Sequence, residues 1–158
     1  MIRRNFATSA LALAATAFGC YAPQAVASKA DGIVTNRSAY PMNETIERIT
    51  KDVEMKGIKL FGVIDQAKLA KDAGVDLRPS SLVVFGNPPL GTLFITARAE
   101  AGLDWPVRLL VFEDEKGQVW TAYTDFAWIS RRHSIRNRDP QFKKATEVIK
   151  SIVATTMN

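Results

Sequence analysis

The chain has 158 residues, of which 47% are hydrophobic and 23% are charged, and its formal net charge at pH 7 is +5. This length is typical of one domain and suffices to bury a core. One cysteine and one histidine exclude a disulfide framework, a cysteine metal site and any metal site built mainly from histidine.

Residues 1–27 have the pattern of a signal peptide. Arg3-Arg4 forms a basic start, an apolar run follows at 10–18, and Ala25-Val26-Ala27 matches a signal-peptidase cleavage site. We therefore expect cleavage after this site and a mature domain of residues 28–158. The twin arginines fit an ordinary secretory signal and also a twin-arginine signal, and we favour the secretory route.

The same segment bears on the location of the mature chain. Bulky Phe18 fits poorly in a lipoprotein signal that would be cut before Cys20, so we expect the cysteine to be lost with the peptide. The apolar span is barely long enough for a membrane helix, and Gly19 and Pro23 weaken it further. The prediction is a periplasmic or secreted protein with no transmembrane helix in the mature chain.

Periodicity and capping residues predict an alternation of strands and helices. The clearest helix covers residues 43–56, where apolar side chains recur every three or four positions, Asn43 is a preferred N-cap and Gly57 suits a left-handed C-cap. The segment 90–101 fits a strand as well as a helix, and the helical template fits better. The other predicted elements are strands at 32–35, 58–64 and 82–85, a helix at 66–73, a hairpin of strands at 107–113 and 118–124, a short helix at 126–132 and a helix at 141–154.

These elements predict a single α+β domain in which an antiparallel sheet is covered on one face by helices. The apolar run at 82–85 has the length of a buried central strand. The two longer helices, at 43–56 and 141–154, are expected to pack on the sheet.

The predicted strand at 82–85 ends at an unusual corner, Gly86-Asn87-Pro88-Pro89. Gly86 permits a positive φ, and Pro88 restricts Asn87 to an extended conformation. The corner therefore holds one amide, a donor and an acceptor, rigidly at the lip of the core.

A set of short motifs closely resembles the bacterial DUF302 family, the domain of unknown function 302, over about residues 32–135. The motifs are Gly57-Ile58-x-x-Phe61, Ile64-Asp65, Leu82-x-x-Phe85-Gly86-Asn87-Pro88, Gly91-Thr92, Leu103-Asp104-x-Pro106 and the turn at 113–117. The resemblance implies a small α+β domain with a helical layer on one face of an antiparallel sheet, implies dimers, and implies no established activity. The family commonly has a histidine where this chain has Gln66, which cannot titrate.

Four other polar residues are candidates for a functional site. Asp65 and Asp125 each follow an apolar strand, and each is either an N-cap or half of an acidic pair at one end of the sheet; capping needs no further assumption. His133 lies among arginines, and a helix-terminal role is favoured over a catalytic one. Arg108 either points to solvent, pairs with a neighbour on the sheet, or joins Asn87 as an anion-recognising pair.

We therefore predict a non-catalytic module that binds a small ligand or a partner at the Phe85-Gly86-Asn87-Pro88 corner. Its candidate lining residues beside Asn87 are Asp65, Gln66 and Arg108, then Asp125 and His133. The alternative is an enzyme that uses Asp65 or Asp125 for metal-assisted or acid–base chemistry. Gln66 in place of the family's histidine and the lack of a thiol in the mature chain weigh against this alternative.

The remaining composition bears on cofactors and partners. We expect no cofactor and no bound metal, because no ligand spacing typical of a metal site is present. The tail at 130–158 is basic, but export disfavours nucleic-acid binding, and a solvated helix face explains the charge. Aromatic residues gather late in the chain and predict either core or a homodimer interface; they are Trp105, Trp120, Tyr123, Phe126 and Trp128.

Overall fold

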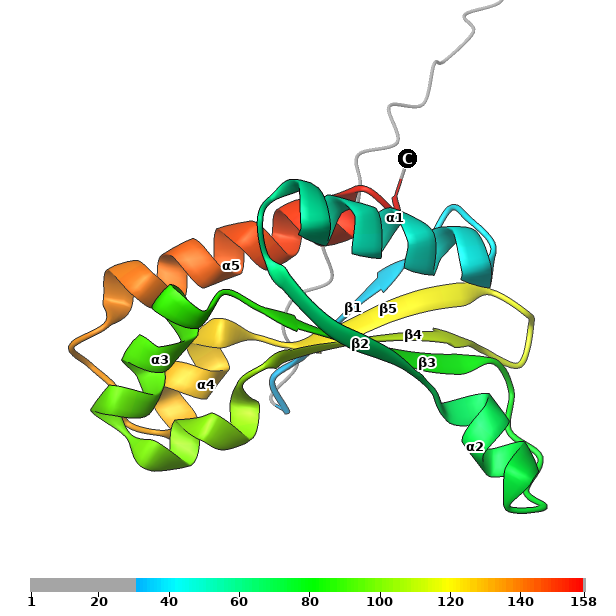
Figure 1. Ribbon diagram of the computed structural model, residues 1–158, viewed down its shortest axis with the longest axis horizontal. Coiled ribbons are helices and arrows are strands. Elements are labelled where there is room, and N and C mark those ends of the chain that lie inside the picture. The colour runs from blue at the N-terminus through cyan, green and yellow to red at the C-terminus, as the bar shows by residue number, and fades with distance from the viewer. Residues whose placement is uncertain (1–30, 158) are drawn as a thin grey trace, which may run out of the picture.

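One antiparallel sheet and six helical segments make up the computed structural model of the protein, which describes residues 31–157. The strands are β1 (Ile33–Arg37), β2 (Lys59–Asp65), β3 (Ser80–Gly86), β4 (Val107–Glu113) and β5 (Val119–Thr124). The helices are α1 (Met42–Met55), α2 (Gln66–Asp72), α3 (Pro88–Ala97), the 3-10 helix η1 (Ala99–Asp104), α4 (Phe126–Arg132) and α5 (Asp139–Ala154). The strand order is β1-β5-β4-β3-β2 (Figure 1).

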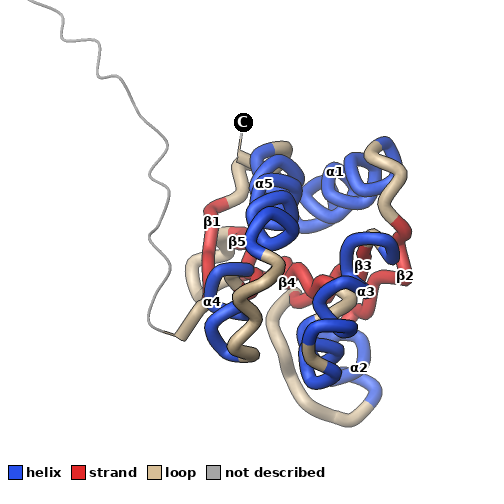
Figure 2. Tube along the Cα trace, turned by 90° about the vertical axis from the view of Figure 1, so that its left-hand side faces the viewer, coloured by secondary structure: helices blue, strands red, loops and turns tan. Residues whose placement is uncertain are grey.

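The helices form a layer on one face of the sheet. The long helices α1 and α5 lie side by side above it, as Figures 1 and 2 both show, and they contact each other. Helices α3 and α4 pack against α5 at one end of the molecule, whereas α2 lies at the other end beside β3. The predicted α+β class, with an antiparallel sheet covered on one face by helices, is confirmed.

The core lies between the sheet and the two long helices. Alternate side chains of the inner strands point toward the helices and are almost completely buried, because the side chains of a strand alternate between its two faces. The contributors from the strands are Val83, Phe85, Leu109 and Val111, and those from α1 and α5 are Ile49, Val53, Ile149 and Ile152. Each such side chain contributes roughly 1.5–3 kcal/mol by leaving water.

Two helices begin earlier than predicted. Helix α1 starts at Met42 with Pro41 as its N-cap, so the prediction of Asn43 as the cap is wrong. The buried hydroxyl of Thr45 instead lies 2.7 Å from that of Ser38 and donates to the carbonyl oxygen of Tyr40, which fixes the start of the helix. Helix α5 starts at Asp139 rather than at residue 141, with a proline in its first turn, where a missing N–H costs nothing.

Strand β3 is an interior strand but not the middle one. It pairs with β2 on one side and with β4 on the other, and β4 is the middle of the sheet. Val83 points toward the helices and is fully buried, whereas Val84 lies on the opposite face, half-buried and paired with Arg108. The apolar run at 82–85 therefore has one core face and one partly exposed face.

Within residues 31–157, no helix has both the length and the apolar character that crossing a bilayer requires. The predicted signal peptide at 1–27, its cleavage site and Cys20 lie outside the residues that the structure describes.

The two faces of β3 differ in the stability that a truncation removes. Val83→Ala should lower the free energy of unfolding by roughly 2 kcal/mol, because it removes buried methyl groups and leaves a cavity. Val84→Ala, with the same loss of strand propensity, should cost less than about 1 kcal/mol. Urea unfolding of both variants measures the difference, and equal losses would contradict the assignment of the faces.

Candidate functional site: a pocket at the Asn87 corner

Asn87 ends strand β3 and caps helix α3. Its backbone is extended, with φ of −101° and ψ of 106°, as the following proline demands. Its side-chain Oδ1 accepts a hydrogen bond from the backbone N–H of Leu90 at 3.2 Å, and its carbonyl oxygen accepts one from Gly91 at 2.8 Å. The predicted rigid corner is present, but the acceptor of the amide is used by the helix. The group left to meet a ligand is the donor, Nδ2.

Trp105 packs into the notch that two glycines leave open beside this corner. A Cβ atom at Gly86 would lie 2.9 Å from Nε1 of the Trp105 indole, and one at Gly91 would lie far inside contact distance of the same atom. The ring of Phe61 on β2 meets the indole edge-on at 6.0 Å between centroids. The two glycines are therefore required by the close approach of the indole.

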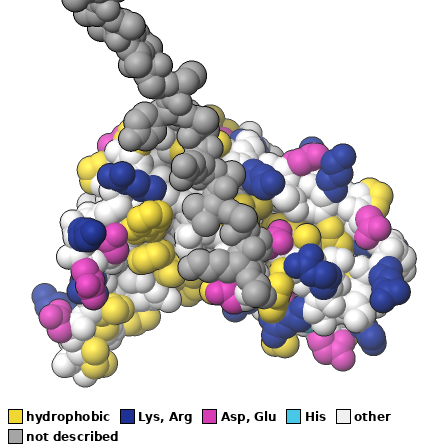
Figure 3. Space-filling view, turned by 180° about the vertical axis from the view of Figure 1, so that it is seen from behind, with side chains coloured by type: hydrophobic (Ala, Val, Ile, Leu, Met, Phe, Trp, Pro, Cys, Tyr) yellow, Lys and Arg dark blue, Asp and Glu magenta, His cyan; other side chains and the backbone are white. Residues whose placement is uncertain are grey.

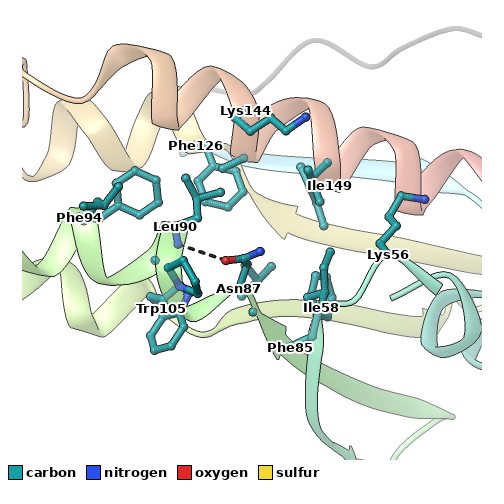
Figure 4. Close-up of a pocket in the computed structure, with 17 residues that line it drawn as sticks. Lys56, Ile58, Phe85, Asn87, Leu90, Phe94, Trp105, Phe126, Lys144 and Ile149 are labelled. Carbon is teal, nitrogen blue, oxygen red and sulfur yellow. Dashed lines mark hydrogen bonds between the residues drawn. The ribbon is translucent and has the colours of Figure 1, made fainter. Parts of the chain in front are cut away.

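A pocket of about 580 Å³ opens between this corner and helix α5 (Figure 4). Its walls are mostly aliphatic and aromatic, and they come from β3, α3, the loop before β4, α4 and α5. The apolar side chains that line it are Ile58, Phe85, Pro89, Leu90, Leu93, Phe94, Trp105, Val107, Phe126, Ala145, Val148 and Ile149.

Three polar side chains complete the lining: Lys56, Asn87 and Lys144. Lys56 follows α1, and its Nζ lies 2.6 Å from both carboxylate oxygens of Asp52. Lys144 projects from α5 at the edge of the pocket, with its Nζ turned outward (Figure 4). The pocket lining contains no acidic side chain and no histidine.

The sequence-predicted residues Asp65 and Gln66 do not join Asn87. In the antiparallel register Asp65 pairs with Ser81 at the start of β3, whereas Asn87 follows the end of that strand. The Oδ1 of Asp65 accepts from the backbone N–H of Lys68 at 2.9 Å, so its predicted capping role is confirmed. The Oε1 of Gln66 accepts from the hydroxyl of Ser80 at 2.7 Å. Neither side chain lines the pocket.

Asp125 caps α4, as predicted, by accepting from the backbone N–H of Ala127 at 3.2 Å. Strands β2 and β5 run in opposite directions, so Asp65 and Asp125 lie at opposite ends of the sheet (Figure 1), and the acidic pair is not formed. Burial, and then the Asp125 carboxylate, raise the pKa of Tyr123 to about 12. Residues 31–157 contain no group of three or more His, Cys, Asp or Glu side chains arranged to hold a metal ion.

Arg108 and His133 instead meet around Asp104, whose side chain is only 4% exposed. The Asp104 carboxylate lies 2.6 Å from His133 Nε2, 3.2 Å from Arg132 Nη1 and 3.6 Å from Arg108 Nη2. The Arg108 side chain also donates to the carbonyl oxygen of Leu103 at 2.7 Å. Its hydrogen bond and its ion pair are thus with η1, and not with Asn87 or with a side chain of the sheet. His133 is the C-cap of α4, which confirms the helix-terminal interpretation.

The Asp104 cluster joins η1, α4 and β4 and is too tight to be a ligand site. The adjoining cavity is about 20 Å³, room for about one water molecule. Sequence reasoning missed the Asp104 cluster, although Asp104 stands in the Leu103-Asp104-x-Pro106 motif. It also missed the pocket walls, because the sequence predicts a solvated helix face for the basic tail that contains Lys144, and a core or dimer-interface position for Trp105.

Comparison with known families matches residues 34–155 to the family described as "Domain of unknown function DUF302". The match confirms the resemblance that the motifs predicted. It also extends that resemblance beyond residue 135, so that α5, which forms one wall of the pocket, lies inside the matched region.

A solved structure shows the same fold. The crystal structure of an uncharacterised conserved DUF302 protein from Bacillus stearothermophilus matches with a TM-score of 0.72 and covers 80% of this chain and 99% of that chain. The sequence identity is 16%, so the likeness shows the arrangement of strands and helices and not a shared ligand.

Curated relatives carry a different name. Two proteins called "Fluoride-specific ion channel FluC 1", from Brucella suis and Brucella abortus, are 40% identical to this chain over 104 residues. That stretch is 66% of this chain and 41% and 38% of the two relatives. The chain thus spans about two fifths of their length.

The packing of Trp105 should be sensitive to one methyl group added at Gly91. Gly91→Ala should lower the melting temperature by several degrees, because the new Cβ displaces the indole and opens the corner. Gly102→Ala is the matched control, since its Cβ would meet only Ile95 Cδ1, at 3.9 Å. Thermal unfolding followed by tryptophan fluorescence compares the two, and an unchanged Gly91→Ala protein would contradict the packing described.

Proposed function

The chain belongs to the DUF302 family, and we propose that it is a non-catalytic binding module that holds a small ligand in the pocket at the Phe85-Gly86-Asn87-Pro88 corner. The observation that carries this proposal is the pocket itself. Its volume of about 580 Å³ lies within the range of about 300–1,000 Å³ that small-molecule sites occupy. An apolar lining with a few fixed polar groups is also the usual composition of such sites.

The chemistry of the lining favours binding over catalysis. Acid–base work requires a group that titrates near the working pH, and the titratable side chains of the lining are two lysines. One of them, Lys56, is held in an ion pair with Asp52. The enzyme alternative uses Asp65 or Asp125, and each of these carboxylates caps a helix, at opposite ends of the sheet and outside the pocket lining.

The name of the Brucella relatives raises fluoride as a ligand for comparison. This chain covers about two fifths of those proteins, so channel activity is not carried over to it. A fluoride ion is small and strongly hydrated, and an apolar pocket of this size offers it little to replace its water. We propose a ligand with an apolar body and include fluoride as a test compound.

A thermal-shift screen of the purified protein tests the proposal. Compounds with an apolar body should raise the melting temperature by several degrees, because a ligand at one hundred times its Kd stabilises the folded state by about 2.7 kcal/mol. Sugars, divalent metal ions and sodium fluoride should leave it unchanged.

Paired tryptophan variants on α5 then locate the site. Val148→Trp places an indole in the pocket and should abolish the shift, whereas Glu147→Trp, at the exposed neighbouring position outside the lining, should preserve it. A screen without any hit, or a hit that survives Val148→Trp, would refute the pocket as the binding site.

We also propose that the chain forms a homodimer, through a different surface from the aromatic one considered above. Tyr123 and Phe126 are buried in the core, so they supply no interface. Of the nine exposed large hydrophobic side chains among residues 31–157, six lie between 61 and 77, on the edge strand β2, on α2 and in the loop after it. They are Phe61, Val63, Ile64, Leu69, Val75 and Leu77. Figure 3 shows yellow side chains on the lobe that carries α2, beside a hollow underside.

Self-pairing of β2 is supported by its charges. An antiparallel pair of two copies with a two-fold axis at Gly62 would place Lys59 of one copy opposite Asp65 of the other, at both ends. The same register would set Phe61 opposite Val63 of the second copy. A symmetric dimer requires one surface that is complementary to itself. The charge pattern of β2 is compatible with this requirement, although a bulge lies between Leu60 and Gly62.

Sedimentation velocity tests the dimer. The native protein should sediment as a dimer, and Val63→Lys should shift it to the monomer because a charge enters the apolar contact. Leu103→Lys, at a position 65% exposed on η1 and outside β2 and α2, should stay dimeric. A native protein that is monomeric at high concentration would overturn the proposal.

A further inference from the structure

The polar side chains that line the pocket are mainly donors. The Oδ1 of Asn87 already accepts from the backbone N–H of Leu90, so Nδ2 is the group of this side chain that has no partner in the cap. Lysine ammonium groups have donors and no acceptor, so Lys56 and Lys144 add only donors. The lining contains no carboxylate, no histidine and no hydroxyl side chain. A ligand that satisfies these groups must present acceptors.

The net charge at the rim is close to one positive unit. The ammonium group of Lys56 is neutralised by Asp52, whose side chain is only 10% exposed. Lys144 makes no ion pair with any of the residues 31–157. Its long side chain can keep its stem along the apolar wall while its charge stays at the edge. One uncompensated cation at the mouth favours a single negative charge on the ligand.

The interior of the pocket demands a hydrocarbon body. Its depth is formed by Ile58, Phe85, Leu90, Phe126 and Ile149. Burying a polar part of a ligand among these side chains would leave that part without hydrogen bonds. The apolar surface of a ligand instead contributes favourable free energy of binding when it leaves water for this pocket.

We infer that the pocket takes amphipathic monoanions, with the apolar body against β3 and α5 and the carboxylate at the rim, where Asn87 Nδ2 donates to it and the flexible side chain of Lys144 turns its ammonium group toward it. This inference rests on the proposed binding function. Two features of the pocket support it: polar side chains that offer mainly donors, and, at the edge of an apolar cavity, one cation without an ion-pair partner among residues 31–157.

Isothermal titration with three ten-carbon probes tests the inference: decanoate and decylammonium, each below its critical micelle concentration, and decanol below its solubility limit. Decanoate should bind at least about tenfold more tightly than decanol, because a hydrogen bond to a charged group replaces a neutral one. Decylammonium should not bind. Along octanoate, decanoate and dodecanoate the affinity should rise about fourfold per methylene until the pocket is full.

Two outcomes separate this inference from the binding proposal. Equal affinities for decanoate and decanol would overturn the anion preference and leave the pocket as a binding site for apolar molecules. No binding of any of the three probes would overturn both the preference and the proposed function.

Charge variants locate the carboxylate. Asn87→Asp keeps a good N-cap for α3 but replaces the free donor with a negative charge, and Lys144→Glu reverses the charge of the rim. Each should weaken decanoate at least about tenfold and leave decanol unchanged, with an unchanged melting temperature of the free protein. Lys143→Glu, on α5 but outside the lining, is the control. Equal decanoate affinities of Lys144→Glu and Lys143→Glu would overturn the inference.

Discussion

The packing of one indole ring, that of Trp105, fixes the geometry of the site. Trp105 lies against Gly86 at the end of β3, against Gly91 in α3 and against Phe61 on β2, so it joins a strand end, a helix start and an edge strand. The adjacent residue, Asp104, is tied to α4 through His133. Because the corner, the cap of α3 and one wall of the pocket all touch this ring, its packing sets their positions relative to each other. Because protein interiors are packed as densely as organic crystals, a shift of this ring would displace the residues that touch it.

Local interactions are the part of this structure that the sequence predicts well. The caps formed by Asp65 and Asp125 each join a side chain to a backbone N–H two or three residues further along, so spacing alone reveals them. The cap formed by Asn87 is equally local, but it was not among the caps predicted from the sequence. The hairpin of β4 and β5 and the apolar periodicity of α1 and α5 are signals of the same short range. The cap of α1 failed as a prediction because Ser38, outside the helix, contacts Thr45 and fixes where the helix begins.

The site depends on contacts that sequence spacing does not encode. Lys56, Asn87 and Lys144 line one pocket although long stretches of chain separate them. On sequence alone, the role of His133 is judged from the arginines that neighbour it along the chain. The fold instead brings His133 to the carboxylate of Asp104, 29 residues earlier. Similarly, Val83 and Val84 are equal in an apolar run and differ only because the sheet has helices on one side. Tertiary packing decides all three cases.

Helix α5, one wall of the pocket, is attached to the rest of the domain differently along its length. Its C-terminal end is held where the backbone N–H of Ala39 donates to the carbonyl oxygen of Thr156 at 2.8 Å. The residues that face the pocket, from Lys144 to Ile149, lie in the middle of the helix and meet the sheet through side chains rather than through shared backbone hydrogen bonds. Occupancy of the pocket and the docking of this part of the helix are therefore thermodynamically linked: a molecule that fills the pocket stabilises the docked helix, and a change that loosens the helix speeds the dissociation of the molecule.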